Sequence, residues 1–225
     1  MNKASRLKEM IKKMTQPING QYPRPWMIDS PADPASSVVL TVGHNQAKGF
    51  PVERVGSHEH YMEALFNRGS ETCRQLYDRI TDNKPSETRK NTDKLVRRLA
   101  EHGVRNVLET NVICYSTPMS ADLRQSLHIN GAKRGREIFE ALLEIIKPKV
   151  LIAHGSGTAK ELSRSLNHPL RPEPNEPNQL VEVKVNTIMV CVIPSLAPPR
   201  YNMWAGWAPK HLDQVSHRVA KHLAD

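Results

Sequence analysis

KPKVLIAHGSGT, residues 147–158, decides the fold because one short stretch ends a helix, forms a buried strand and begins a new helix. Pro148 blocks continuation of the apolar helical pattern that runs over residues 132–146. Residues 150–153 are wholly apolar, as expected of a strand that is covered on both faces. The GSGT turn then opens a further helix. This order predicts a parallel strand within a sheet covered by helices.

The same alternation extends in both directions from this stretch. Strands are predicted at residues 38–42 and 106–112, helices at 70–80 and 92–102, a hairpin at 180–185 and 187–193, and a final helix at 209–223. The pattern predicts an α/β fold, with one domain over residues 35–225 whose central, mostly parallel sheet is flanked by helices. A length of 225 residues suits a single domain of this size.

Residues 1–34 are predicted to form a basic N-terminal helix followed by an extended arm. Apolar residues recur at helical spacing as far as Met14, with lysines and an arginine around them. We expect this helix to pack on the body of the domain. The arm is rich in proline, and we expect Tyr22, Trp26 and Met27 to pin it to the core. No chemistry is assigned to the arm.

Charge and composition narrow the class of partner. The chain has 32 Lys plus Arg against 23 Asp plus Glu, a formal net charge of +9, which attracts polyanions and puts DNA first among the expected partners. The three cysteines include no CxxC pair, so the sequence supports neither a disulfide framework nor a cysteine-rich metal site. No apolar run approaches the roughly 20 residues that cross a bilayer. We therefore expect a cytoplasmic monomer with no membrane contact.

Four segments place polar residues where apolar runs end. They are TVGHNQA at 41–47, ETNVICYSTP at 109–118, KPKVLIAHGS at 147–156 and VIPSLAPPRY at 192–201. The carboxyl ends of parallel strands meet at one edge of a sheet. The four segments are therefore predicted to form one site at that edge.

The four segments together resemble the uracil-DNA glycosylase superfamily, over about residues 38–207. The resemblance implies a monofunctional DNA glycosylase, which turns a base out of DNA and hydrolyses its N-glycosidic bond to leave an abasic site. It implies no redox cofactor and no catalytic metal. Repair of DNA and defence against phages with modified DNA are both roles that fit this activity.

The resemblance assigns the catalytic role to Asn45, with His44 beside it, in the GHNQA segment. A neutral Asn amide can orient a water below C1′ of the sugar but accepts its proton poorly, so catalysis would depend on positioning and electrostatics. Gln46, where the family usually has Pro, is included among the base-binding residues. By the same resemblance, Asn111 faces the flipped base, whose polar edge an amide can read. Ala47 stands where strict uracil enzymes carry Tyr, which leaves room for a 5-modified pyrimidine such as a hypermodified phage cytosine.

The loop at 193–201 matches the family's segment that enters the minor groove. Pro194 and Ser195 match the pattern, and the resemblance places Leu196 or Arg200 where a side chain fills the gap left in the base stack. Ile193 replaces the family's frequent His. The departing base therefore needs another source of stabilisation.

Two positions outside that loop are predicted to contact the DNA backbone. Lys48 follows the first segment, and Ser156 lies in the GSGT turn, whose backbone N–H groups suit a phosphate or simply cap the helix. The stretch 49–60 is predicted to be a loop that forms the outer wall of the base pocket. Its His58 and His60 lack a clear third ligand, which favours a solvated loop over a metal site.

Two other classes of protein remain open. A binding protein of the same fold would hold a flipped base or abasic site without cleaving it, which suits the departures at Asn45, Gln46 and Ile193. An α/β enzyme acting on free nucleotides or nucleosides would need neither the basic charge nor Leu196 as a wedge. Plain uracil and mismatched thymine remain possible substrates after modified pyrimidines.

Overall fold

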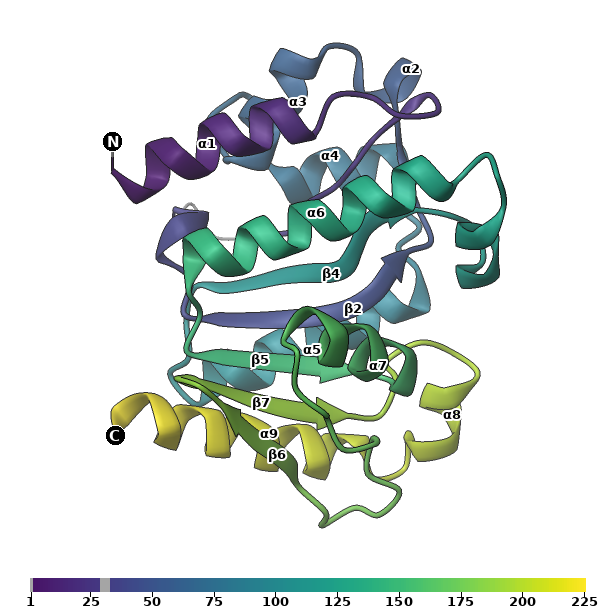
Figure 1. The fold of residues 1–225 in the computed structure, drawn as a ribbon. Coiled ribbons are helices and arrows are strands. Elements are labelled where there is room, and N and C mark those ends of the chain that lie inside the picture. Colours follow the sequence, from purple (N-terminus) through teal and green to yellow (C-terminus); the bar gives the residue numbers. More distant parts are fainter. Residues whose placement is uncertain (1, 29–32) are drawn as a thin grey trace.

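A five-stranded sheet forms the centre of the protein, with strand order β4-β2-β5-β7-β6 (Figure 1). The computed structural model describes residues 2–28 and 33–225. The strands are β2 (Val39–Gln46), β4 (Val107–Ser116), β5 (Val150–His154), β6 (Val181–Val185) and β7 (Ile188–Ile193). The first four in spatial order are parallel, and β6 adds an antiparallel edge. The predicted α/β fold with a mostly parallel central sheet is confirmed.

Helices cover both faces of this sheet (Figure 1). One face carries α1 (Lys3–Met14), α6 (Ile129–Ile146) and α7 (Ser156–Ser165), and the other carries α5 (Glu87–Glu101) and α9 (Ala208–Ala224). Each face has its own apolar core, because the strands are buried on both sides. All three cysteines are buried.

Shorter elements surround the carboxyl edge of the sheet and one end of the molecule. They are β1 (Gln21–Tyr22) paired with β3 (Phe50–Pro51), the helices α2 (Val52–Val55), α3 (His58–Leu65), α4 (Cys73–Ile80) and α8 (Arg200–Trp204), and the 3-10 turns η1 (Pro34–Ser36) and η2 (Ser120–Arg124). In Figure 1 the parallel strands point toward the side on which α8 lies.

The N-terminal helix and arm lie where the sequence predicts them. Lys3 on α1 donates from Nζ to the carbonyl of Ile146 at 2.7 Å, which ties α1 to the end of α6. Trp26 is fully buried, and its Nε1 donates to the carbonyl of Leu65 at 2.9 Å. Tyr22 and Met27 are also buried. The arm is therefore part of the core.

Three expected boundaries are wrong. Strand β2 does not end at residue 42 but continues to Gln46, because β4 pairs with it as far as Ser116 across a bulge. Residues 49–60 are not a loop but contain β3, α2 and the start of α3. Helix α5 begins at residue 87 rather than 92, since Ser86 caps it by accepting the backbone N–H of Arg89.

Candidate functional site

A cavity of about 430 Å³ lies at the carboxyl ends of β2, β4 and β5. The arm before β2, the start of α5 and the start of α7 complete its wall, together with residues next to α8. The sequence-predicted residues that line it are His44, Asn45, Gln46, Ala47, Lys48, Asn111, Ser156, Ser195 and Arg200. The predicted convergence of the strand ends is confirmed in the structure.

Gly43 lies on β2 between two polar side chains that line this cavity. A Cβ at this position would lie 2.5 Å from Oδ1 of Asn111 and 2.9 Å from Nε2 of His154. Only the absence of a side chain allows both groups to lie over the middle of β2. Asn111 makes no side-chain hydrogen bond to another residue of the described ranges, so its amide is available to a ligand.

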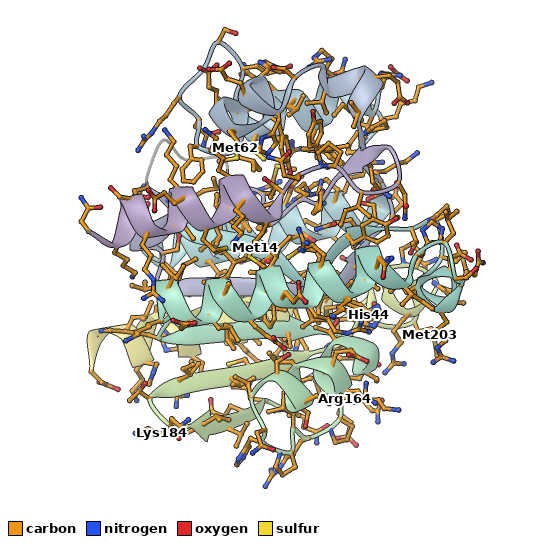
Figure 2. All side chains as sticks on the ribbon, turned by 45° about the horizontal axis from the view of Figure 1, so that its top comes forward. Met14, His44, Met62, Arg164, Lys184 and Met203 are labelled. Atoms are coloured by element: carbon orange, nitrogen blue, oxygen red, sulfur yellow. The ribbon has the colours of Figure 1, made fainter. Side chains whose placement is uncertain are left out.

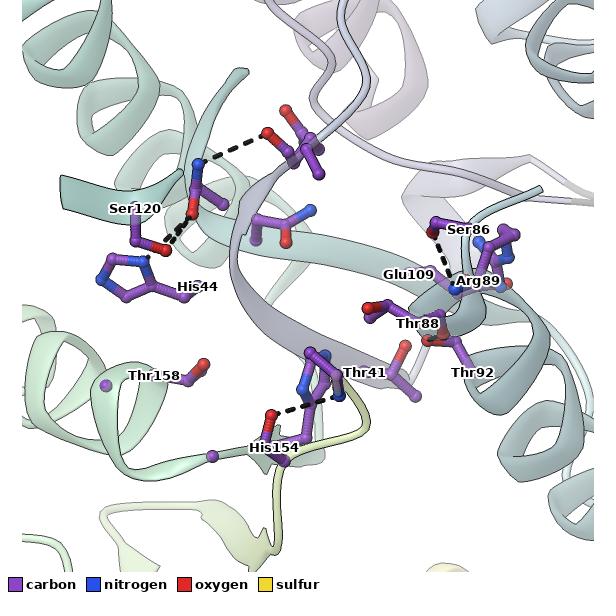
Figure 3. Close-up of a pocket in the computed structure, with 18 of the residues that line it drawn as sticks. Thr41, His44, Ser86, Thr88, Arg89, Thr92, Glu109, Ser120, His154 and Thr158 are labelled. Carbon is purple, nitrogen blue, oxygen red and sulfur yellow. Dashed lines mark hydrogen bonds and ion pairs between the residues drawn. The ribbon is translucent and has the colours of Figure 1, made fainter. Parts of the chain in front are cut away.

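Asn45 is held by hydrogen bonds at the rim of the cavity (Figure 3). Its Nδ2 donates to Oγ1 of Thr117 at 2.9 Å, and its Oδ1 accepts from Oγ of Ser120 at 2.9 Å. Nδ1 of His44 lies 3.2 Å from the same Oδ1. When Nδ1 of His44 carries the proton of this contact, Nε2 is left as an acceptor. The amide is thereby fixed in orientation, and the imidazole beside it can accept a proton.

Charged groups gather on the opposite side of the cavity, near α5 (Figure 3). Arg89 is buried and forms ion pairs with Glu109 on β4 and, at 2.8 Å, with Asp93. Thr88 and Thr92 flank it on the same helix and also line the cavity. This group was not predicted from the sequence, although an acidic residue, Glu109, directly follows the apolar pair Val107 and Leu108, which was the available signal.

His154 ends β5 and is a second residue that the sequence analysis missed. Burial lowers the pKa of its imidazole to about 4, and the positive charge of Arg89 adds to the effect. The imidazole is therefore neutral near pH 7. Its Nδ1 is buried and has no hydrogen-bond partner. In the sheet register His154 stands opposite Ile193, the position at which the resemblance leads one to expect a His.

Arg24 places the arm, to which no chemistry is assigned from the sequence, at the wall of the cavity. Its guanidinium lies over the rings of Phe50 and Tyr77, at 5.2 and 5.3 Å from their centroids. Gln46 is buried beside it and donates from Nε2 to the backbone carbonyl of Arg24 at 2.8 Å. The side-chain amide of Gln46, which was predicted to bind a base, thus holds the arm in position.

The loop after β7 does not present the predicted apolar wedge. Leu196 is fully buried in the core under α5 and α9, and its carbonyl accepts from Nδ2 of Asn91 at 3.0 Å. Pro194 is also buried, and neither residue lines the cavity. Assigning Leu196 as the wedge is therefore wrong for this structure, since the loop turns back into the core after the strand. Ser195 and Arg200 do line the cavity, and Nε of Arg200 donates to Glu173 at 2.7 Å.

The outer wall predicted at residues 49–60 is wrong as well. His58 lies on α3, where its Nε2 is 3.0 Å from Oγ1 of Thr15, and Nε2 of His60 lies 2.9 Å from Glu71. Both imidazoles are thus used to pack α3 away from the cavity. The exposed rim is formed instead by Ala47, Lys48 and Ser156.

No protein-family model and no curated protein matches this chain. Across residues 2–28 and 33–225, the helices are too short or too polar to span a bilayer.

Proposed function

We propose that the protein is a DNA glycosylase that accepts a base turned out of DNA into the cavity at the carboxyl edge of the sheet. The observation that carries the proposal is the shared position of Asn45 and Asn111. One amide is fixed at the rim by its neighbours, and the other is unpartnered within the described chain and lies over Gly43. An N-glycosidic hydrolase needs both a group that positions water and a group that reads the base.

Base recognition is assigned to Asn111 and His154. A free amide offers one donor group and one acceptor, which matches the polar edge of a pyrimidine. A neutral imidazole next to it can donate a hydrogen bond to the carbonyl oxygen on which negative charge develops as the base departs. His154 in this way supplies the donor that Ile193 cannot provide.

Water positioning is assigned to Asn45 and His44. In the reaction the C1′–N bond breaks and its electron pair leaves with the base, while the water oxygen bonds to C1′. The water must lose a proton, and Nε2 of His44 is the acceptor that remains when Nδ1 donates to Asn45. Both residues were predicted from the sequence as catalytic, with Asn45 orienting the water, and the contact between the two side chains gives His44 the role of proton acceptor.

A 5-modified pyrimidine is the substrate class that we propose. Ala47 is exposed at the rim and its methyl group closes little of the opening. Within the cavity, Arg24, Arg89 and Thr92 offer donors to a polar substituent. Removal of modified bases from phage DNA is the biological role that fits this substrate, and repair of uracil or mismatched thymine is the narrower alternative.

A binding protein without turnover is the second candidate, and one observation favours it. The carboxylates that line the cavity within the described residues, Glu109 and Glu173, are ion-paired with Arg89 and Arg200. The cavity therefore has no unpaired carboxylate to act as a strong base among those residues. Such a protein would hold the flipped base or abasic site through the same Asn111.

Release of a base from DNA separates these candidates. The purified protein is incubated with duplex and single-stranded DNAs that carry uracil, mismatched thymine, hydroxymethylcytosine or glucosylated hydroxymethylcytosine, and free base is detected by mass spectrometry. The glycosylase proposal expects release from at least one DNA, lost in Asn45→Ala while DNA binding is kept. Tight binding without release from any of them supports the binding protein instead.

A further inference from the structure

Arg24 differs from the other cations of the cavity because it has no counter-ion among residues 2–28 and 33–225. Arg89 is paired with Glu109, and Arg200 is paired with Glu173. Lys48 is exposed, so water solvates its charge. Arg24 is mostly buried, and no carboxylate of a described residue forms an ion pair with it. Its Nη1 is inaccessible to solvent and has no hydrogen-bond partner.

A buried arginine without a counter-ion is unusual, because the guanidinium stays charged in proteins and loses its hydration on burial. Burial is the largest influence on Arg24 and lowers the pKa of the group. The faces of Phe50 and Tyr77 offset part of this cost through cation–π contacts. They satisfy none of the N–H donors, which point in the plane of the guanidinium. The group is therefore held in place with its edge left to a ligand.

A second unpartnered group faces the same space. Oγ1 of Thr41 on β2 is buried and has no hydrogen-bond partner, although its residue lines the cavity. Arg89 lies close enough for its charge to act on both Arg24 and His154. Two groups at this end of the cavity, Nη1 of Arg24 and Oγ1 of Thr41, can thus donate hydrogen bonds and have no partner among the described residues.

We infer that Arg24 forms an oxyanion site inside the cavity, which binds a phosphate or carboxylate group of the bound ligand. The planar fork of a guanidinium matches two oxygens of either group. Two sources are chemically equivalent here, a phosphate of the flipped nucleotide and an acidic substituent on its base. The inference concerns the cavity of the proposed glycosylase but does not require turnover.

Inorganic phosphate is the first probe, titrated into the full chain. Arginine Nε–H resonances are followed by NMR in the wild type and in Arg24→Met, which keeps an apolar stem between the two rings. Arg68→Met is the matched control, since Arg68 lies over the ring of Phe66 at 5.8 Å but outside the cavity. We expect a saturable shift of one resonance that is absent from Arg24→Met and retained in Arg68→Met. No saturable shift in the wild type, or the same shift in Arg24→Met, overturns the inference.

Arg24→Lys keeps the charge and loses the fork, which guards against misfolding of the Met variant. Phosphate binding about tenfold weaker than in the wild type is expected, because a lysine cannot bind two oxygens in parallel. Unchanged affinity in a folded Arg24→Lys variant contradicts an arginine-specific oxyanion site.

Three DNAs identify the source of the oxyanion. They carry an abasic-site analogue, 5-methylcytosine or 5-carboxylcytosine. If Arg24 binds a DNA phosphate, Arg24→Met should weaken the binding of all three DNAs equally. If Arg24 binds a carboxylate on the base, only the binding of the DNA with 5-carboxylcytosine should become weaker. Equal affinity of wild type and Arg24→Met for all three overturns the inference. If no base is ever released but these differences are found, the proposed activity fails and the oxyanion site stands.

Discussion

The rim and the inner end of the cavity are built in different ways. At the rim, His44 and Asn45 are neighbours in the chain. Hydrogen bonds to the hydroxyl groups of Thr117 and Ser120 hold Asn45, and His44 contacts the same amide. At the inner end, Arg24 comes from the arm, Arg89 from α5, Glu109 from β4 and His154 from β5. Arg89 and Glu109 are buried, and Arg24 and His154 are mostly buried. A neutral, ordered rim suits the positioning of water, whereas a buried end rich in charge suits the recognition of a ligand. In the proposed glycosylase, the rim would therefore carry catalysis and the inner end recognition.

Removing the base-reading amide is expected to have the largest effect on activity. Asn111→Ala should lower the rate of base release by about 100- to 1000-fold, the usual loss for one hydrogen-bond donor in a transition state. Single-turnover kinetics measure this, with Asn130→Ala as the control because Asn130 is exposed on α6. An unchanged rate in Asn111→Ala would remove recognition from this end of the cavity.

Leu196 distinguishes a core residue from a wedge. Leu196→Ala should lower the free energy of unfolding by about 3 kcal/mol, because a fully buried leucine is replaced by a cavity. Denaturant titration measures the change. Met203, which is 72% exposed and lies with His44 at the same side of the molecule in Figure 2, is the control. Met203→Ala should change stability by less than about 0.5 kcal/mol.

The outcome for Leu196 is informative in either direction. If Leu196→Ala keeps its stability but no longer releases the base, Leu196 would act as the wedge in the base stack, and the buried position of this loop would be contradicted. A less stable variant that releases base normally below its melting temperature supports the buried position.

His154, at the inner end of the cavity, is expected to make the stability of the protein depend on pH. Its pKa is about 4 in the folded protein and about 6.5 in an unfolded chain. The unfolded state therefore binds the extra proton first as pH falls from 6.5 to 4, and the folded state loses stability over that window. The fall corresponds to about 3 kcal/mol, all of it present above pH 6.5.

Denaturant titrations from pH 7 to pH 4 on the wild type and His154→Gln measure this contribution. The wild type should lose more stability than the variant as the pH falls. If the free energy of unfolding changed with pH in the same way in both proteins, burial would not hold His154 neutral. The proposed recognition of the base by a neutral imidazole would then be contradicted.

Ala47 is expected to show the smallest effect, one of selectivity at the rim. Ala47→Tyr should lower release of a 5-substituted base relative to uracil by about tenfold, since a ring at the opening excludes the substituent. Competition between two labelled DNAs measures the ratio. A ratio equal to that of the wild type would mean that the rim does not select the base.

The rim could be predicted from the sequence, and the inner end could not. Asn45 at the rim follows the apolar run of β2, and Asn111, which lies over Gly43, is on the neighbouring parallel strand β4. The order of strands in the sequence therefore already places these two residues near each other. Arg24 lies in a proline-rich arm and Arg89 at the start of a helix. Only tertiary packing brings these two residues to the cavity, and no local period marks them.

Leu196 shows that a local sequence pattern can also lead to a wrong prediction. A leucine after a Pro-Ser turn has the same local pattern whether it projects to solvent or turns back into the core. Contacts with α5 and α9 decide the outcome here, and those helices are distant in sequence. Similarly, Gly43 has the pattern of a strand-ending turn, yet β2 continues because β4 pairs beyond it.

A crystal structure of Asn45→Ala bound to duplex DNA tests most directly whether the cavity holds a base turned out of the helix. The DNA should be the member of the substrate panel that the wild type binds most tightly. We predict the target base in the cavity, with its polar edge within hydrogen-bond distance of the Asn111 amide. A base still stacked in the duplex, or DNA bound on another face of the protein, would contradict the proposed site.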